Sequence, residues 1–419
     1  MEIIFEKRMK SHHDVGGILN KYLEKKIVTE SDLMEFLNKS PENIPRAIYV
    51  HTPYCDKICS FCNLNRKQLQ GSLDEYSNFI ASEFKKYGKT KYFQERDFEV
   101  IFFGGGTPTV YKPNQLEIIL KSIQENVSLA PKYEFTFETT LHNLSKEKLN
   151  IMMKYGVNRL SVGIQSFSEE GRKFYNRTFT KEETIDKLKK LKEYFKGDVC
   201  IDIIYNYPNQ KEEDIKEDIK IIKELEISSV SFYSLMIHEG SNLSKDIKNE
   251  KVKIIENLEK EKKLHDIFIE ELCKDEKYYI LELTKIAKKN GDNYQYIKVR
   301  NNGGDTFPIG VGAGGNVGNI SIFRMNKNLS FFSNISNLHK KFSLLSGLLQ
   351  FPIIQKNEIK KILDKKEYNY FLDKINEFKE KKLFIENEKS FIFTKDGIFL
   401  GNNIGYEIVK YIVEKVFEK

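Results

Sequence analysis

Three cysteines within eight residues are the first feature of this sequence that could do chemistry. Cys55, Cys59 and Cys62 follow the spacing C-x3-C-x2-C. Intervals this short curl a loop so that its thiols face one centre, and thiolates are ligands for zinc or iron–sulfur clusters. Structural zinc needs four ligands, and no fourth Cys or suitably spaced His follows nearby. We therefore expect a [4Fe–4S] cluster with one iron open to a small molecule. A zinc site and three metal-free cysteines are the alternatives.

The other two cysteines, Cys200 and Cys273, lie far from this loop in the chain. An odd total of five argues against a disulfide framework. The first residues, MEIIFEKRMKSHH, lack the long apolar stretch of a secretory signal. No apolar run approaches the roughly 18 residues that a membrane span needs. We therefore expect a cytoplasmic protein without a membrane partner.

Glycines and polar residues follow the next predicted strands in turn. The segment Phe103–Thr109, FGGGTPT, follows the second strand, and its glycines let the backbone approach a ligand closely. Glu138 ends the third strand, and Gln165 lies just past the fourth, with Arg177 twelve residues on. Asp202 lies within the apolar fifth strand, where an unpaired carboxylate is costly. Singly, each could be a turn, a cap or a surface group; together they predict a binding site beside the cysteine loop.

An alternation of apolar strands and amphipathic helices must position these residues. Most strands are continuous apolar or β-branched runs, which is typical of a parallel sheet covered by helices. The predicted strands are 47–51, 98–103, 133–139, 159–164, 199–205 and 229–235, and the helices between them are 74–88, 114–126, 145–154, 181–195 and 211–225. Six such units predict an α/β fold with a partial (β/α)6 barrel, whose functional residues lie at the carboxyl ends of the strands.

Composition changes divide the chain into four predicted parts. Residues 1–45 are a helical extension in which Ser31 could cap the second helix, and 46–240 are the barrel. Residues 241–335 complete the barrel, beginning with a long charged helix to about 274 and continuing into a Gly-rich segment. Residues 336–419 predict a winged-helix-like module with helices at 356–364, 367–381 and 402–418 and a two-strand wing between them. We expect this module to be structural or to cover the substrate.

The charge pattern does not indicate nucleic acid as a partner. Lys and Arg number 68 against 61 Asp and Glu, a formal net charge of +7. Basic residues mostly alternate with acidic ones, as on a solvated surface, and no basic motif with interleaved aromatics is present. A mildly basic surface would also suit a substrate that carries carboxylates.

The motifs together resemble the radical S-adenosylmethionine superfamily and, within it, the oxygen-independent coproporphyrinogen III oxidase-like family. YVHTPYC, FFGGGTPT, GVNRLSVGIQSF and DIIYNYPNQ each resemble a block of that family, within about residues 46–325. The resemblance implies a radical S-adenosylmethionine barrel with a [4Fe–4S] cluster, whose open iron chelates S-adenosylmethionine. It also implies that one electron breaks the S–C5′ bond of this cofactor and releases a 5′-deoxyadenosyl radical.

Matching by position carries the family's site residues onto this chain. Contacts to the cluster-bound S-adenosylmethionine would come from Tyr49, Gly105, Glu138, Met236 and Asn316, and contacts to a second one from Phe61, Gly106, Thr107, Gln165, Arg177 and Asp202. We expect catalytic roles for His142, Gln165, Arg177 and Asp202.

A haem substrate would add contacts of its own. His142 stands where the family has a different third-strand motif, so it is the first choice as axial haem ligand, before His51 and His238. Haem propionates could meet Arg172, Arg300 and Arg324, for which surface roles are the alternative.

Within the family, the chain most resembles the haem-utilisation branch, anaerobilin synthase. The resemblance rests on the N-terminal extension, the chain length and the segment Gly312–Gly315, GAGG. It implies oxygen-independent opening of haem to a methylated linear tetrapyrrole with iron release, using electrons from a flavodoxin-like carrier.

Three alternatives stay open. The first is a haem chaperone, although that branch usually begins its cysteine loop nearer the N-terminus. The second is the oxidase, which has a further cysteine where Leu64 stands here. The third is another tailoring methyltransferase.

Overall fold

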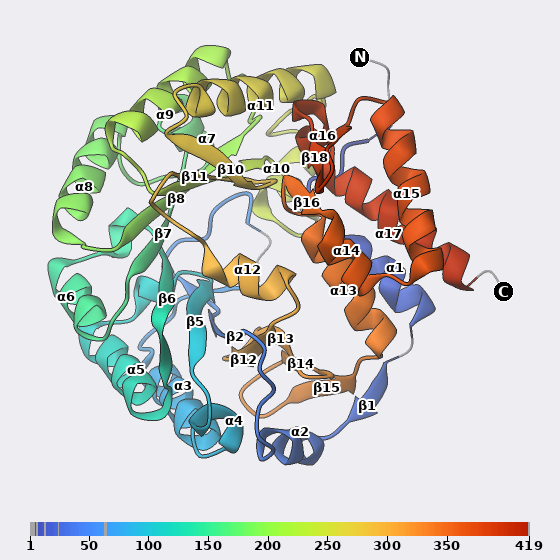
Figure 1. The fold of residues 1–419 in the computed structure, drawn as a ribbon. Helices are drawn as coiled ribbons and strands as arrows, with labels where there is room; N and C mark the ends of the chain where they lie inside the picture. Colours follow the sequence, from blue (N-terminus) through green and yellow to red (C-terminus); the bar gives the residue numbers. More distant parts are fainter. Residues whose placement is uncertain (1–4, 6, 12–13, 24, 63–64, 418–419) are drawn as a thin grey trace.

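The computed structural model describes residues 5, 7–11, 14–23, 25–62 and 65–417. Within these residues a curved sheet of nine strands runs in the order β10-β11-β9-β8-β7-β6-β5-β2-β12 (Figure 1). Its strands are β2 (Arg46–Thr52), β5 (Phe98–Gly105), β6 (Leu129–Thr139), β7 (Arg159–Gln165), β8 (Asp198–Tyr205), β9 (Ser229–Ser234), β10 (Tyr278–Glu282), β11 (Lys285–Lys288) and β12 (Asp305–Ile309). The six predicted strands correspond to β2 and β5–β9, and they pair with one another in parallel. The structure adds β12, parallel to β2, and the antiparallel hairpin β10–β11.

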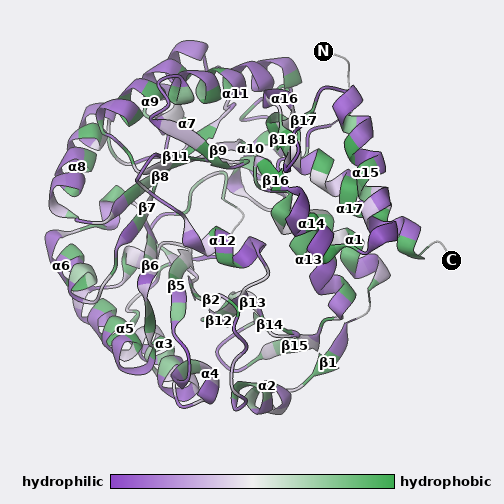
Figure 2. Cartoon of the chain, in the orientation of Figure 1, coloured by the Kyte–Doolittle hydropathy of each residue, from purple (hydrophilic) through white to green (hydrophobic). Residues whose placement is uncertain are grey.

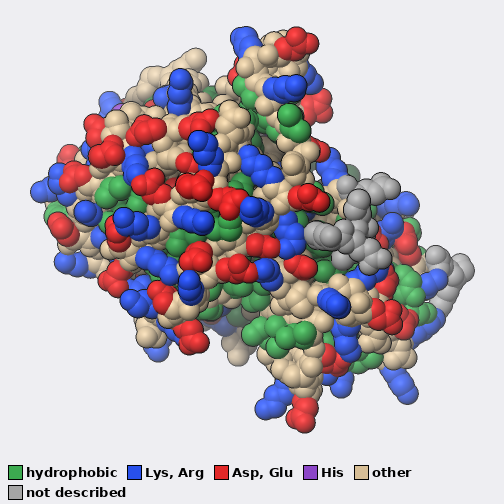
Figure 3. Space-filling view, turned by 90° about the horizontal axis from the view of Figure 1, so that it is seen from above, with side chains coloured by type: hydrophobic (Ala, Val, Ile, Leu, Met, Phe, Trp, Pro, Cys, Tyr) green, Lys and Arg blue, Asp and Glu red, His purple; other side chains and the backbone are tan. Residues whose placement is uncertain are grey.

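Amphipathic helices cover the outside of this sheet. They are α3 (Asp74–Tyr87), the short α4 (Lys91–Gln94), α5 (Pro113–Asn126), α6 (Lys146–Lys154), α7 (Glu169–Phe174), α8 (Lys181–Tyr194), α9 (Glu212–Glu224) and α11 (Leu258–Cys273). In α3, Tyr76, Ile80 and Phe84 recur at intervals of four, so they share one face, and all three are buried. Figure 2 shows this pattern around the ring, with apolar faces turned inward and polar faces outward. Lys and Arg interleave with Asp and Glu on the face seen in Figure 3.

Helix α12 (Gln295–Asn301) lies inside the ring of helices (Figure 1). It packs on β2, β5, β6 and β12. The ring of Tyr296 stacks on Phe102 with centroids 4.5 Å apart and on Tyr49 at 6.2 Å. The barrel is open between β10 and β12, which do not pair within the described residues, and α12 fills part of its interior.

The N-terminal segment is not purely helical. It contains α1 (Asp14–Tyr22) and α2 (Glu30–Leu37), but also β1 (Lys26–Val28). Strand β1 joins a second sheet with β15 (Ser330–Asn334), β14 (Ile320–Arg324) and β13 (Gly314–Val317). The prediction that Ser31 caps α2 is wrong. The cap is Thr29, whose hydroxyl accepts from the Asp32 backbone while the Asp32 side chain accepts in return.

The long helix predicted from about 241 to 274 is interrupted. Helix α10 (Asn242–Lys248) ends before residue 249, and α11 starts only at Leu258. The side chain of Asn257 accepts from the Lys260 backbone and caps α11. An asparagine at this position starts a helix instead of continuing one, because its side chain competes for backbone donors.

The C-terminal residues form a second hydrophobic core. Its elements are α13 (Asn337–Leu348), β16 (Ile353–Gln355), α14 (Lys356–Ile362), α15 (Lys365–Glu380), β17 (Phe384–Glu386), β18 (Ser390–Phe393), α16 (Lys395–Phe399) and α17 (Gly401–Phe417). Strands β16, β18 and β17 form a small antiparallel sheet, and α1 packs on α13 and α17. None of the described helices has the length and apolar composition of a membrane span.

Candidate functional site

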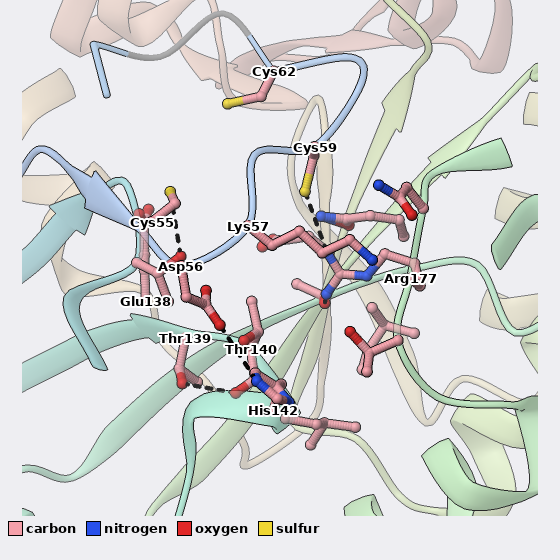
Figure 4. A pocket seen from close by; sticks show the side chains of 18 of the residues that line it. Cys55, Asp56, Lys57, Cys59, Cys62, Glu138, Thr139, Thr140, His142 and Arg177 are labelled. Atoms are coloured by element: carbon pink, nitrogen blue, oxygen red, sulfur yellow. Dashed lines mark hydrogen bonds and ion pairs between the residues drawn. The ribbon is translucent and has the colours of Figure 1, made fainter. Parts of the chain in front are cut away.

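A pocket at the carboxyl ends of the parallel strands contains the three motif cysteines (Figure 4). The cavity has a volume of about 220 Å³. Its walls include most of the residues that the sequence singled out: Cys55, Cys59, Phe61, Cys62, Gly105, Gly106, Thr107, Glu138, His142, Gln165, Arg177 and Asp202. Residues that are more than a hundred positions apart in the chain thus meet at one end of the barrel.

The cysteine loop is fastened to the sheet at both ends. Short parallel strands β3 (Tyr54–Cys55) and β4 (Lys67–Gln68) close it. His51 on β2 donates from Nε2 to the Asn65 carbonyl at 2.9 Å. With that proton on Nε2, the other nitrogen accepts from the Tyr49 hydroxyl at 3.0 Å. His51 therefore holds the loop, and both of its nitrogens are occupied, which argues against its role as an axial haem ligand.

The thiols lie in different surroundings. All three are free. The Thr107 hydroxyl lies 3.5 Å from Cys55 Sγ, and a guanidinium nitrogen of Arg177 lies 3.5 Å from Cys59 Sγ. Burial raises the pKa of the Cys55 thiol to about 11. A thiol that resists deprotonation in the metal-free protein gives up its proton when a metal binds, so metal binding here is coupled to proton release.

Two glycines bring the end of β5 directly against the cysteine loop. A Cβ on Gly106 would lie 2.5 Å from the Tyr54 carbonyl oxygen. Gly105 has φ +109°, and a Cβ there would lie 2.7 Å from the His51 ring. No side chain fits at either position, so the FGGGTPT segment is required by this close approach.

Two carboxylates face the pocket from neighbouring strands. Glu138 Oε2 accepts from the Gly105 backbone at 3.1 Å. Loss of water on burial, with a smaller contribution from the nearby Asp202 carboxylate, raises the pKa of Glu138 to about 8. Two neighbouring carboxylates that are shielded from solvent are costly unless a cation binds between them. This part of the pocket is therefore suited to an ammonium group.

Gln165 and Arg177 shape the opposite wall. Gln165 has φ 71°, unusual for a non-glycine residue, and its buried Oε1 has no hydrogen-bond partner within the part of the chain that the structure describes. The Arg177 guanidinium donates to the Gly163 carbonyl as well as contacting Cys59. An unsatisfied buried acceptor and a backbone held in a rare conformation are both typical of a ligand site.

His142 lies at the rim of the pocket, on the turn Leu141–Asn143 that follows β6. Its Nε2 is 3.4 Å from Asp56 Oδ2, and Asn143 donates to the other oxygen of Asp56 at 3.2 Å (Figure 4). The His142 side chain is 54% exposed. Carboxylates hold metal-ligating histidines in this way, through the ring nitrogen that does not bind the metal. Sequence reasoning missed Asp56, although it directly follows a motif cysteine.

Three of the predicted cofactor contacts lie outside this pocket. Tyr49 lies inside the barrel beside Glu138, next to the position that a Cβ of Gly104 would take. Met236 follows β9 and is half-buried. Asn316 is exposed on β13, opposite Ser321.

The GAGG segment has a packing role. Gly312 has φ +93°, and a Cβ there would lie 3.0 Å from the His51 ring and 2.8 Å from the Asn65 amide nitrogen. A Cβ on Gly315 would lie 2.2 Å from the Thr306 carbonyl. These glycines let the second sheet pack against the base of the cysteine loop. They explain the segment without reference to any particular substrate.

Two of the arginines considered for propionates are committed elsewhere. Arg172 donates to the carbonyls of Ser166 and Phe179 at 3.0 and 2.6 Å. Arg324 is buried and donates to the Tyr87 hydroxyl at 2.9 Å. Both therefore stabilise the fold around the site.

Comparison with known proteins agrees with this geometry. Residues 49–222 match the family model of the radical SAM superfamily. Coproporphyrinogen III oxidase (HemN) from Escherichia coli superposes with a TM-score of 0.74 at 19% identity, over 92% of this chain and 95% of that one. The chain thus carries a radical SAM domain, and its fold is the HemN-like α/β fold with a partial barrel.

Similar curated proteins include haem chaperones and an anaerobilin synthase. The haem chaperone HemW of Lactococcus lactis is 33% identical over 46% of this chain and 50% of its own length. Anaerobilin synthase of Escherichia coli O157:H7 is 24% identical over 68% of this chain and 64% of its own length. HemW of Buchnera aphidicola is 28% identical over 72% of this chain and 79% of its own length. The chain therefore spans only half to two thirds of the first two relatives.

The cofactors of this superfamily are a [4Fe–4S] cluster and S-adenosylmethionine, and the pocket fits both. Within the described residues no three His, Cys, Asp or Glu side chains converge to hold a single metal ion. A cubane does not require convergence, because it takes each thiolate at a different iron. The three cysteines outside any disulfide, the glycines without room for a Cβ and the Gln165 oxygen without a partner among the described residues suit a cluster with an organic ligand beside it.

Glu138→Gln is expected to stabilise the cofactor-free protein while weakening S-adenosylmethionine binding. The raised pKa means that folding favours the neutral carboxyl. Its contribution to stability is complete below pH 4.5 and is lost as the pH rises through about 8. A neutral amide avoids this loss, so the melting temperature at pH 8.5 should rise, on the order of 2 °C, and by less at pH 6. S-adenosylmethionine affinity should fall about tenfold, because a charge-assisted bond is worth about 1.5–3 kcal/mol. Calorimetry and titration at both pH values measure these effects, and a lower melting temperature at pH 8.5 would contradict them.

Proposed function

We propose that Cys55, Cys59 and Cys62 hold a [4Fe–4S] cluster and that S-adenosylmethionine binds beside it in the same pocket. When bound and reduced, the cluster supplies the electron that cleaves S-adenosylmethionine. The observation that carries the proposal is the pocket itself, which brings the three thiols, the glycine cradle and two carboxylates together. Arg177 would fix the position of Cys59, and the His51 contact to Asn65 would fix the rest of the loop.

The other pocket residues would orient the organic cofactor. Glu138 would contact the amino group of the cluster-bound molecule, with Gly105 allowing close approach. Gln165 and Arg177 on the opposite wall would contact a second S-adenosylmethionine, the methyl donor, together with Phe61, Gly106, Thr107 and Asp202. Exclusion of water from a site of this kind protects reactive species from side reactions.

As its substrate we propose haem, opened without oxygen to a methylated linear tetrapyrrole with release of iron. The anaerobilin synthase match over 68% of this chain supports this proposal. The rim position of His142 supports it too, because Asp56 leaves Nδ1 without a hydrogen bond to any described residue. The chain would then be a methyltransferase of the cytoplasm, where free thiols are kept reduced, and would take electrons from a flavodoxin-like carrier.

The haem chaperone is the second candidate. The 33% identity to the Lactococcus protein favours it, over half of that relative. The Buchnera chaperone favours it too, because its match has a higher identity and covers more of both chains than the anaerobilin synthase match does. The oxidase is the third candidate, suggested by the fold similarity. The further cysteine of the oxidase corresponds to Leu64, which lies outside the described residues.

Haem turnover under anaerobic conditions separates the three. The reconstituted protein is mixed with haem, S-adenosylmethionine and a reductant, and the haem absorption band, free iron and 5′-deoxyadenosine are followed together. We expect the band to disappear as iron is released. A persistent band at one haem per chain would favour the chaperone. Loss of carboxylates from coproporphyrinogen would favour the oxidase. His142→Ala should slow haem loss at least tenfold, whereas His238→Ala, outside the pocket, should not.

A further inference from the structure

A second, larger cavity lies beside the cysteine pocket and shares no lining residue with it. Its volume is about 520 Å³, within the roughly 300–1,000 Å³ of pockets that bind small organic ligands. It is formed by the segments that follow β8 and β9, the start of α11 and the N-terminal residues around Arg8. Nothing in the proposed chemistry of the cysteine pocket uses this space.

The N-terminal wall of the cavity is firmly attached. Arg8 donates to the Phe399 carbonyl at 2.7 Å and forms an ion pair with the buried Glu261. The Met9 backbone donates to the Asn403 side chain at 2.8 Å. Lys10 donates to the Leu235 carbonyl at 3.0 Å. This segment therefore bridges the C-terminal module and the barrel. Hydrogen bonds and an ion pair hold this wall of the cavity in place.

The charges around the cavity are unbalanced. Glu261 is already paired with Arg8 and Lys10. Lys7, Lys253 and Lys260 also line the space, and against them stands one further acid, Glu256. None of the three lysines has an acidic partner within 4.0 Å among the described residues. Three ammonium groups around one cavity repel each other unless an anion joins them. The cavity is thus suited to a ligand with more than one negative group.

Part of the remaining lining is apolar, beside the polar Asn206, Asn209 and Asn257. Leu235, Ile237, Ile254, Ile255 and Leu258 face the space. Ile237 is 43% exposed and Ile255 is 74% exposed, which is unfavourable for large aliphatic side chains without a partner. Apolar walls with a few convergent charges are typical of sites for amphipathic organic molecules.

We propose that this cavity binds a tetrapyrrole dicarboxylate, with the ring against the isoleucines and the carboxylates on Lys253, Lys260 and Lys7. The choice of a tetrapyrrole rests on the proposed function. The location is independent of it.

Three aromatic rings separate the two cavities. Phe61 lines the cysteine pocket and Tyr207 lines the second cavity. Tyr175 lies between them, with ring centroids 5.2 Å from Phe61 and 5.7 Å from Tyr207. A macrocycle in the second cavity is therefore held next to the cysteine pocket, behind a wall. The second cavity is thus a holding site, from which the ligand moves to the cysteine pocket or to another protein.

Titration of the full, reconstituted chain with metal-free protoporphyrin IX tests the proposal, because this probe needs no axial ligand. Porphyrin fluorescence should report binding to the wild type that weakens with added salt. Lys253→Glu with Lys260→Glu should weaken it at least tenfold. The matched control, Lys216→Glu with Lys220→Glu, makes the same change in net charge on the exposed side of α9 and should bind like the wild type.

A second pair of variants tests the apolar wall without disturbing the core. Ile255→Asp should weaken porphyrin binding about tenfold, whereas Ile385→Asp, at a position 58% exposed on the wing, should not. Equal affinities for the wild type and the Lys253/Lys260 variant, or no binding to the wild type, would overturn the proposal. The proposal would also be overturned if the Lys253/Lys260 variant bound porphyrin normally but were reduced poorly by an acidic electron carrier. The lysines would then belong to a docking site for that carrier protein. Formation of 5′-deoxyadenosine in the same samples tests the proposed function separately.

Discussion

Each of the single variants Cys55→Ala, Cys59→Ala and Cys62→Ala should lose most of its iron after anaerobic reconstitution. A cluster held by three thiolates has no spare protein ligand, and the structure shows no fourth cysteine in the pocket among the described residues. Iron and acid-labile sulfide per chain measure the loss. We expect less than a fifth of the wild-type content in each variant, with no 5′-deoxyadenosine formed.

The other two cysteines are the natural controls. The Cys200 thiol is buried on β8 and lies 3.3 Å from Asp292 Oδ2, and Cys200 is not among the residues that line the pocket. Cys273 ends α11. Cys200→Ala and Cys273→Ala should therefore keep their iron. Iron loss from Cys200→Ala equal to that from Cys59→Ala, in a variant that still melts cooperatively, would contradict the ligand assignment.

Local sequence patterns were sufficient for the barrel and for the clustering of its site. Strands β2 and β5–β9 are mostly apolar runs of six to eleven residues separated by amphipathic helices, so composition and period identify them. Once the strands are parallel, Glu138, Gln165 and Asp202 must meet the cysteine loop at one edge. Strand β12 was not predicted, because the Gly-rich sequence around Asp305–Ile309 shows no strand pattern and its partner β2 is about 260 residues away.

Side-chain partners in the site could not be predicted in the same way. His51 looks like a ligand because it ends a strand, yet Asn65 and Tyr49 occupy both of its nitrogens. The GAGG segment looks like a substrate signature, yet His51 and Thr306 account for two of its glycines. Both roles depend on contacts between segments up to 260 residues apart, which no local pattern records.

Asp292→Ala should cost about 3–5 kcal/mol of unfolding free energy, because it leaves a buried guanidinium without its partner. Asp292 and Arg159 are 1% and 2% exposed. Arg159 donates to both Asp292 oxygens, at 2.9 and 2.8 Å, and the Tyr294 backbone donates to Oδ1 at 2.8 Å. The same carboxylate therefore fixes β7 and the start of α12. Urea denaturation at pH 7 measures the loss, and Asp186→Ala, at an exposed pair on α8, should leave the midpoint unchanged.

The pH dependence of this loss has the opposite sign to that of Glu138. Burial alone would raise the pKa of Asp292, but Arg159 outweighs burial and holds the pKa well below its ordinary value of 3.8. The stabilisation is therefore complete above pH 4 and declines at lower pH, because the unfolded chain takes up a proton there that the folded carboxylate does not. The difference in stability between wild type and Asp292→Ala should therefore shrink as the pH falls below 4. Arg159→Met added to Asp292→Ala should recover part of the loss, since the cost lies in the unpaired charge. If the losses of unfolding free energy instead add up in the double variant, each side chain acts through packing alone. The ion pair would then contribute nothing to holding α12 against the barrel.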